Sequence, residues 1–220
     1  GARRVQWHRF YAQQPWPAPQ AMAAAVEAAV RAALGAHGTR PVFVWCFIEV
    51  DRMIHQQGYS DEVIEVVAAM GQLAGRLAEQ GMVVVAHSHH GLVRTRHNEG
   101  IEACLNGLSA RFGVELGGAG RTRWVYAPAS SLDRVRDCLE RELGSCVRVC
   151  PANEVFGSFG LARARVGELV LIAQGEQFVT FDGHAFDHGS DLEDEVHVPL
   201  AVWDGSGHYH ARPWSTESVR

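Results

Sequence analysis

Two hydrophobic patterns alternate along the first 150 residues. Apolar residues recur at helical spacing in the segments 19–35, 60–80, 99–112 and 130–143. The segments 41–50, 82–87 and 121–127 are instead nearly continuous apolar runs with β-branched and aromatic residues, which is typical of buried strands. The chain is therefore expected to alternate helices with strands.

Residues that favour helix ends flank these segments. Pro19 opens the first predicted helix and Gly35 ends it. Ser60 stands where an N-cap is expected, two acidic residues follow it, and Gly81 closes the segment. At the last of the four helices, Ser130 with Asp133 three residues later predicts a capping box.

The later part of the chain adds further strands. They are predicted at 145–150, within 167–181 as a hairpin around Gly175, and at 196–204. Strands that alternate with helices at this spacing indicate β-α-β units. We therefore predict an α/β fold with a mainly parallel sheet, covered by helices on both faces, and we place Trp45 in its core.

Composition narrows the possible functions. The 220 residues are 47% hydrophobic and 20% charged, which is enough to bury a core of ordinary size. A net charge of -5 provides no basic surface for phosphate backbones, so nucleic acid is not expected as a partner. No apolar run approaches the roughly 18 residues that span a bilayer, and no signal peptide is recognisable. We expect no membrane partner and a cytoplasmic location.

Two residue types limit the chemistry further. The five cysteines form no C-x-x-C pair, so we expect reduced thiols rather than disulfides or a cysteine zinc site. All 20 residues counted as Lys or Arg are arginine. Catalysis by a lysine nucleophile or Schiff base is therefore excluded.

Histidine and carboxylate residues follow the predicted strands. Asp51 and His55 come directly after the first strand, one helical turn apart, and His89 and His90 come directly after the second. In open α/β sheets, ligands bind beyond the carboxyl ends of the strands. These side chains are therefore expected at one rim of the sheet.

A third group precedes the last predicted strand. It consists of His184, Asp187 and His188 in the segment "DGHAFDHGSDLEDE". Together the three groups offer nitrogen and oxygen ligands of the kind that suits zinc or manganese. Arg94 and Arg96 follow the second group, and we predict that they hold a phosphate or carboxylate of the substrate.

Four segments resemble one known family in order and spacing. They are "FIEVDRMIHQQGYS", "VVVAHSHHG", "FGSFGLARARVGELVLIAQGEQF" and "DHGSDLEDEVHVPLAVW". Between about residues 40 and 204 the chain is similar to the C-terminal half of bacterial type I phosphodiesterases and nucleotide pyrophosphatases of the alkaline phosphatase superfamily. The resemblance implies an alkaline-phosphatase-like fold. It also implies that the protein is a metal-dependent hydrolase of phosphodiester or pyrophosphate bonds.

The resemblance also implies the metal ligands. Asp51, His55 and His188 would bind one metal ion, and His90 would belong to a second site. Two zinc ions are expected from the family, one is plausible, and manganese is possible. His184 and Asp187 are predicted to orient His188, as metal-bound imidazoles usually require.

The chain departs from the family pattern at two points. Family members have an aspartate directly before the His-Gly dipeptide, where this chain has His89. An imidazole there removes one negative charge, so the affinity and Lewis acidity of a bound metal are expected to differ. The second departure is that no segment before residue 41 resembles the family's strand, nucleophile and helix.

We therefore expect the N-terminal strands and the nucleophile to come from elsewhere. The covering element would be an N-terminal fragment, a partner chain or a second copy, because a sheet without its first strands exposes apolar edges. The predicted organisation is an arm and helix at 1–40, a metal-binding domain at 41–204 and a tail at 205–220.

The sequence leaves two functions open. The first is a hydrolase that acts on a small phosphate ester, or the C-terminal chain of one. The alternative is a diverged family member with one metal ion or none, which serves another biosynthetic reaction or acts as a binding subunit.

Overall fold

The fold is described from a computed structural model. It describes residues 5–10, 15–38, 41–157, 160, 165–181, 183–206 and 209–214, with only the backbone for 5–10, 37 and 209–214. The chain divides into two compact units. The first unit comprises residues 1–88 and 199–220, the second comprises residues 89–198, and each is described by itself.

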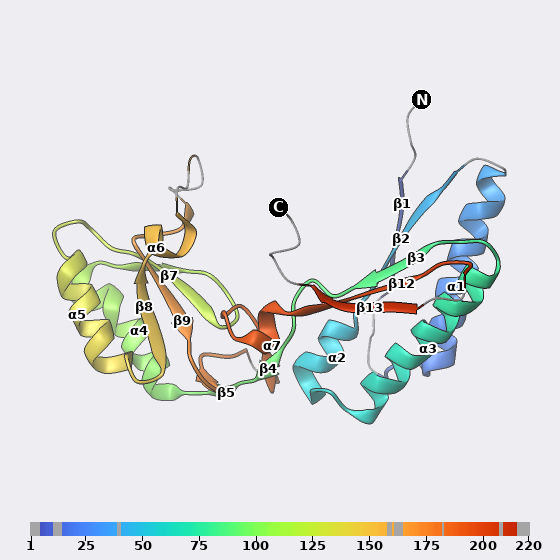
Figure 1. Cartoon of the computed structure of the whole chain (residues 1–220). Helices are drawn as coiled ribbons and strands as arrows, with labels where there is room; N and C mark the ends of the chain where they lie inside the picture. Colours follow the sequence, from blue (N-terminus) through green and yellow to red (C-terminus); the bar gives the residue numbers. More distant parts are fainter. Residues whose placement is uncertain are drawn as a thin grey trace. The chain divides into compact units, whose positions relative to one another are not determined.

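Among its described residues, the first unit combines two long helices, α1 and α3, and the short helix α2 with five strands (Figure 1). β1 pairs in parallel with β2, β3 pairs antiparallel with β12, and β13 lies on the other side of β12. The elements are β1 (Val5–Phe10), α1 (Pro19–His37), β2 (Phe43–Ile48), α2 (Val50–Gln57), α3 (Asp61–Glu79), β3 (Val84–His87), β12 (Val198–Trp203) and β13 (Tyr209–Trp214).

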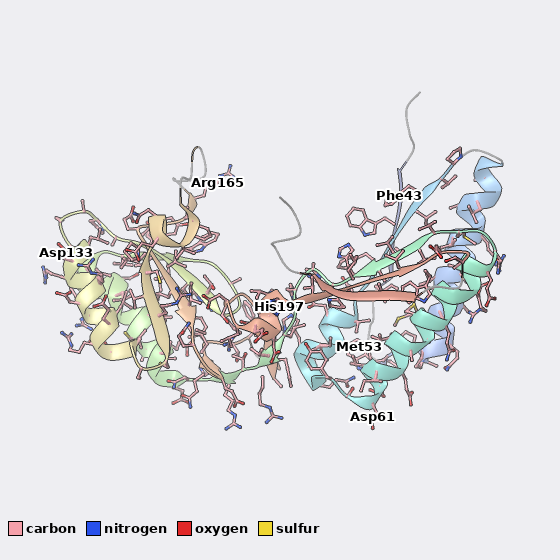
Figure 2. The ribbon with its side chains drawn as sticks, viewed as in Figure 1. Phe43, Met53, Asp61, Asp133, Arg165 and His197 are labelled. Atoms are coloured by element: carbon pink, nitrogen blue, oxygen red, sulfur yellow. The ribbon has the colours of Figure 1, made fainter. Side chains whose placement is uncertain are left out.

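Helices cover one face of the strands in this unit. Alternate residues of β2, among them Val44 and Cys46, pack with Val84 of β3 against buried residues of α1 and α3. The intervening residues point the other way, and Phe43 of β2 (Figure 2) is 64% exposed. Among the described residues, helices thus cover only one face of these strands, unlike in the predicted fold. The placement of Trp45 in the core is wrong, because Trp45 is 49% exposed.

The helices themselves match the sequence pattern. α3 begins directly after Ser60, whose Oγ accepts a hydrogen bond from the backbone N–H of Val63 at 3.4 Å. Asp61, at the first position of α3 (Figure 2), carries a negative charge that the helix dipole favours. The apolar stripe predicted from the 3.6-residue period is the buried face of α3.

The second unit contains a four-stranded antiparallel sheet in the order β6-β7-β9-β8. Two shorter pairings, β11 with β4 and β10 with β5, complete it. The elements are β4 (Val93–Arg94), β5 (Arg96–His97), α4 (Glu99–Phe112), β6 (Glu115–Gly117), β7 (Thr122–Tyr126), α5 (Leu132–Leu143), β8 (Val147–Pro151), α6 (Ala152–Phe156), β9 (Leu169–Ala173), β10 (Gln177–Phe178), β11 (Phe186–Asp187) and α7 (Glu193–Val196).

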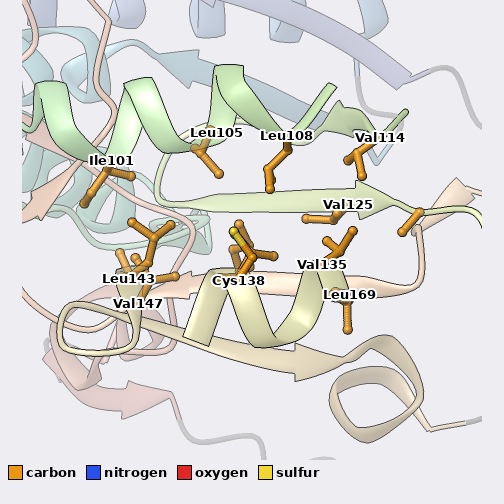
Figure 3. Close-up of a cluster of buried hydrophobic side chains, with 14 of the residues drawn as sticks. Ile101, Leu105, Leu108, Val114, Val125, Val135, Cys138, Leu143, Val147 and Leu169 are labelled. Carbon is orange, nitrogen blue, oxygen red and sulfur yellow. The ribbon is translucent and has the colours of Figure 1, made fainter. Parts of the chain in front are cut away.

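The sheet of the second unit is covered on both faces. Leu169 and Leu171 of β9 face a core formed with α4 and α5 (Figure 3). Val170 and Ile172 face the other way and pack with Ala152 of α6. All five residues of β9 are buried, as expected for a strand between two layers.

The predicted mainly parallel sheet is wrong. Five pairings in the described residues are antiparallel, whereas β1 with β2 and β10 with β5 run parallel. In the second unit, β7 and β8 run in the same direction and are joined by α5, as in a β-α-β unit, but β9 lies between them and is antiparallel to both. The short strand β6, which has no strand pattern in the sequence, adds a further antiparallel pairing at the edge. It forms a hairpin with β7 through Gly118 and Gly120, whose positive φ angles of 90° and 59° suit glycine.

Several smaller expectations also change. β9 does not form a hairpin around Gly175, because it pairs with β7 and β8 while β10 pairs with β5. The N-cap of α5 is Ser131 rather than Ser130, and its hydroxyl donates to the carbonyl of Pro128 instead of capping the helix. The predicted tail contains β13. Among the described residues, no helix has the length and apolar character needed to cross a membrane.

Candidate metal centre

In the first unit, α2 holds Asp51 and His55 on one face. The helix begins directly after β2, and its fourth residue Met53 is 1% exposed in a core with residues of α1 and α3. Asp51 Oδ2 and His55 Nε2 lie 3.6 Å apart, one helical turn from each other. His55 is 8% exposed. A carboxylate and an imidazole are thus held together at the end of a strand.

In the second unit, two histidines far apart in sequence come together. The rings of His90 and His188 stack with centroids 3.5 Å apart and planes inclined by 17°. His89 lies beside them, with its ring centroid 3.9 Å from that of His90 and an interplanar angle of 53°. The structure therefore brings together the histidines that follow β3 and those that precede β12.

The stacking limits how these imidazoles bind metal. The lone pair of an imidazole nitrogen lies in the plane of its ring, so a bound ion lies close to that plane. Two nearly parallel planes 3.5 Å apart cannot both contain one ion at ordinary Zn–N distances of about 2.0–2.1 Å. His90 and His188 in this arrangement are suited to ligate different ions.

A hydrogen bond fixes the tautomer of His90. Its Nδ1 lies 3.0 Å from the carbonyl oxygen of Gly91. A carbonyl oxygen only accepts, so Nδ1 of the neutral ring carries the proton and Nε2 carries the lone pair. This is the pattern that metal-binding histidines usually show. His90 therefore fits the chemistry of a metal ligand.

Asp187 holds the backbone of His188. Its side chain is buried, and Oδ1 accepts a hydrogen bond from the backbone N–H of His188 at 2.9 Å. Burial lowers the pKa of the Arg123 guanidinium below its usual value, and the negative charge of the nearby Asp187 opposes part of this shift. His184, the other predicted orienting residue, packs its ring edge against Phe181 with centroids 5.7 Å apart.

The two predicted substrate-binding arginines lie on short strands at the surface. Arg94 of β4 is exposed, and its guanidinium carbon lies 5.9 Å from the ring centroid of Phe186. Arg96 of β5 is also exposed, with its Nε 3.2 Å from Oε2 of Glu176. Both guanidinium groups are thus accessible, and that of Arg96 already has a carboxylate neighbour.

Two further residues beside the histidines were not identified from the sequence. Arg121 and Glu195 are completely buried and lie between the segments that carry His90 and His188. Their sequence contexts gave no signal, because an arginine at a strand start and a glutamate in the acidic run 191–195 normally lie at the surface.

Comparisons with known proteins gave matches only among solved structures. No protein-family model and no curated protein matches this sequence. Phosphonoacetate hydrolase from Sinorhizobium meliloti, in complex with phosphonoformate, matches with a TM-score of 0.61 and 18% identity, over 84% of this chain and 51% of its own.

Two mammalian enzymes give similar matches. Murine ectonucleotide pyrophosphatase/phosphodiesterase 5, an inactive variant in complex with AMP, matches with a TM-score of 0.59 and 15% identity, over 86% of this chain and 53% of its own. The human protein of the same name matches with a TM-score of 0.57 and 14% identity, over 89% of this chain and 52% of its own.

The chain shares their fold. It is an α/β fold like that of these solved structures, and the chain spans about half the length of each of them. Identities this low establish the fold alone, since one fold supports several chemistries. The activity has to be argued from the residues of the site.

Proposed function

We propose that this chain is the metal-binding part of a hydrolase of phosphodiester or pyrophosphate bonds. The observation that carries the proposal is the stacked pair of His90 and His188, whose planes suit two separate ions. Asp51 and His55 supply a second pair of ligands on α2. The family resemblance assigns both pairs to one dinuclear centre, with zinc as the expected metal.

Each ligand has a distinct part in this proposal. By the family resemblance, Asp51 and His55 would bind the first ion together with His188, and His90 would bind the second. Asp187 fixes the backbone of His188 through the hydrogen bond to its N–H. When bound, two zinc ions would polarise the phosphoryl oxygen and lower the pKa of the attacking group. The residues present fit this role because each offers nitrogen or oxygen donors of the right type.

The matched structures and the two arginines support a proposal for the substrate class. One of the matched enzymes is described in complex with AMP and another with phosphonoformate, so both hold small molecules with phosphorus–oxygen groups. We propose that the substrate of this chain is likewise a small phosphate ester or anhydride. Arg94 and Arg96 are exposed guanidinium groups that would pair with its phosphate oxygens.

The nucleophile is proposed to lie outside these 220 residues. The matched structures are about twice as long as the part that this chain covers. In addition, the open face of the first unit carries four exposed large apolar side chains: Phe43, Trp45, Val83 and Val85. Apolar surface of this kind usually contacts another polypeptide. An N-terminal segment, a partner chain or a second copy would cover it.

His89 favours the alternative function. It stands where the family has a metal-binding aspartate, and it is an exposed imidazole beside His90. A neutral ligand in place of a carboxylate weakens the attraction for a divalent ion. In this alternative the chain binds one ion or none and serves another biosynthetic reaction or acts as a binding subunit.

Metal titration of the purified chain tests the proposal. Zn²⁺ and Mn²⁺ would be titrated by calorimetry into metal-free protein, and the metal content of protein as purified would be measured by elemental analysis. Two ions per chain are expected. His55→Ala and His188→Ala should each lose one ion, and His90→Ala should lose the other.

His197→Ala is the matched control, because His197 is exposed and lies beside Glu193 rather than in the centre. It should bind both ions like the wild type. Binding of a single ion would support the alternative. If His89→Asp then restored binding of a second ion, the loss of that ion would be due to His89. Absence of any binding would contradict the proposed hydrolase and would leave the alternative in its metal-free form.

A further inference from the structure

A completely buried ion pair lies beside the histidines of the second unit. Nε of Arg121 is 2.7 Å from Oε1 of Glu195, and the two side chains are 0% and 1% exposed. Burial raises the pKa of Glu195, and the positive charge of Arg121 opposes this shift. Neither residue has a role in the proposed metal chemistry.

The guanidinium group of Arg121 is held from three sides. Besides the ion pair through Nε, Nη1 donates to Oγ1 of Thr95 at 3.0 Å and Nη2 donates to the carbonyl of Gly175 at 2.7 Å. Thr95 is itself buried, and its hydroxyl donates to the carbonyl of Val93 at 3.1 Å. The position of Arg121 is therefore fixed relative to β4, β5 and the loop between β9 and β10.

The same two residues hold both histidine segments. The backbone N–H of Arg121 donates to the carbonyl of His188 at 2.7 Å, and the hydroxyl of Ser190 donates to the carboxylate of Glu195. The carbonyl of Glu195 accepts from the backbone N–H of Gly91 at 2.9 Å. One ion pair thus connects the residue after His90 with the residues around His188.

Two glycines bring these backbones into direct contact. A Cβ on Gly91 would lie 1.9 Å from the carbonyl oxygen of Asp194, next to Glu195. A Cβ on Gly120 would lie 2.2 Å from the carbonyl oxygen of His188. The histidine segments therefore meet the ion pair backbone to backbone, without an intervening side chain that could absorb a shift.

Stability alone is a weak reason for such a pair. Removing two charges from water costs several kcal/mol per ion, and apolar replacements of similar size are often neutral or stabilising. What the pair adds is a set of directional contacts that end on the two histidine segments. Contacts of this kind fix a geometry that apolar packing leaves free.

We propose that Arg121 and Glu195 are positioning residues that hold His90 and His188 in their stacked arrangement. The metal-binding part of this inference rests on the proposed function. The arrangement itself can be tested without metal, because contacts between the two rings are observable in the apo protein. The proposed function and this inference can therefore fail separately.

The test compares three variants of the full chain in two measurements. Glu195→Gln removes the charge and keeps the size, Arg121→Lys keeps the charge and loses the three-sided donor set, and Ser190→Ala removes one hydrogen bond to Glu195. The first measurement is the nuclear Overhauser contact between the His90 and His188 rings in metal-free protein. The second is Zn²⁺ affinity by chelator competition.

Leu108→Ala is the matched control. Leu108 is 0% exposed in the core between α4 and the sheet, so its truncation destabilises the second unit without touching the histidine segments. Unfolding in urea would establish how far each variant is destabilised. Because Ser190→Ala removes only one hydrogen bond, it tests the inference even where Glu195→Gln does not fold.

Glu195→Gln should lose the contact between the two rings and bind Zn²⁺ at least tenfold more weakly. Arg121→Lys and Ser190→Ala should show smaller changes in the same direction. Leu108→Ala should keep the ring contact and the Zn²⁺ affinity, even where it loses as much stability as Glu195→Gln or more. Retention of the ring contact in all three variants would overturn the inference. So would an equal loss in Leu108→Ala, since the effect would then be general destabilisation.

Discussion

The two units build a sheet in different ways. In the second unit, β9 lies between α4 and α5 on one face and α6 on the other, and all five of its residues are buried. In the first unit, β2 and β3 pack against α1 and α3 on one face only. On the other face Phe43 is 64% exposed and Val83 is 71% exposed.

The difference shows that the units are completed differently. A strand covered on both faces has its packing partners within the chain, as β9 does. A strand with apolar residues on an open face has buried the apolar side chains of one face only, as β2 and β3 have. The first unit therefore has the surface where the proposed covering polypeptide would bind, whereas β9 in the second unit is covered by α4, α5 and α6.

Thiol labelling sharpens this comparison most strongly. Burial, together with the neighbouring Glu142 carboxylate, raises the pKa of Cys104 in the second unit to about 12. At pH 8 the native thiol should therefore be roughly a thousandfold less ionised than an ordinary cysteine with a pKa of about 8.5. Burial also raises the pKa of Cys46 on the covered side of β2. Iodoacetamide labelling followed by peptide mapping would measure both.

The order of labelling in urea is the informative outcome. Cys46 should become reactive at a lower urea concentration than Cys104, because the strand that carries it is covered on one face only. The chain in high urea provides the reference rate for both thiols. Identical urea dependence would show that the two units unfold as one.

Core truncation should have the next largest effect. Leu171 on β9 is 0% exposed between the two layers, so Leu171→Ala should destabilise the second unit by about 2–5 kcal/mol. Urea unfolding monitored by circular dichroism would measure the change. A loss below about 1 kcal/mol would mean that the site collapses after truncation, and that β9 is less tightly enclosed than its burial indicates.

The pH dependence of the second unit offers a finer test. Hydrogen bonds from Cys138, Cys104 and Arg111 lower the pKa of Glu142 from 4.5 to about 2. Because the folded pKa is depressed, the stabilisation is complete above pH 4.5 and is lost as the pH falls toward 2. Glu142→Gln should remove this part of the acid sensitivity. Urea midpoints at pH 5 and pH 3 would show it as a smaller difference in the variant.

Salt provides the control for this prediction. Glu142 and its partner Arg111 are both partly exposed, with side chains 33% and 46% accessible. Their interaction should therefore weaken with ionic strength. If Glu142→Gln left the difference between the urea midpoints at pH 5 and pH 3 unchanged, other carboxylates would be responsible for the acid sensitivity.

The four longest of the described helices, α1, α3, α4 and α5, could be predicted from sequence, but the shorter α2, α6 and α7 and the strand pairing could not. α3 carries its own signals, namely the Ser60 cap and an apolar stripe with a 3.6-residue period, and these act locally. β7, α5 and β8 follow the β-α-β pattern, yet β9 lies between β7 and β8 and pairs antiparallel with both, which no local pattern indicates. β6 is three residues long and has no strand pattern. Whether an apolar strand such as β2 is covered on one face or two depends on other segments, so Trp45 was misplaced.

The candidate site divides in the same way. Asp51 and His55 could be paired from sequence because they are four residues apart on one helix. The contact of His90 with His188 depends on tertiary structure, although both stood in recognisable His-Gly dipeptides. Arg121 and Glu195 could not be identified, because nothing in the sequence distinguishes a buried charged residue from an exposed one.

The open face itself should be the least sensitive to substitution. Val83 and Val85 are 71% and 56% exposed, so replacing both by threonine keeps the shape and strand preference and should change stability by less than about 0.5 kcal/mol. Val170→Thr is the same change on covered β9, where Val170 is 1% exposed, and should cost about 1–3 kcal/mol because the hydroxyl is buried. Binding of an apolar fluorescent dye should fall in the Val83/Val85 variant and stay unchanged in Val170→Thr. If the substitutions at Val83 and Val85 reduced stability as much as Val170→Thr, sedimentation would show whether a second copy of the chain already covers this face.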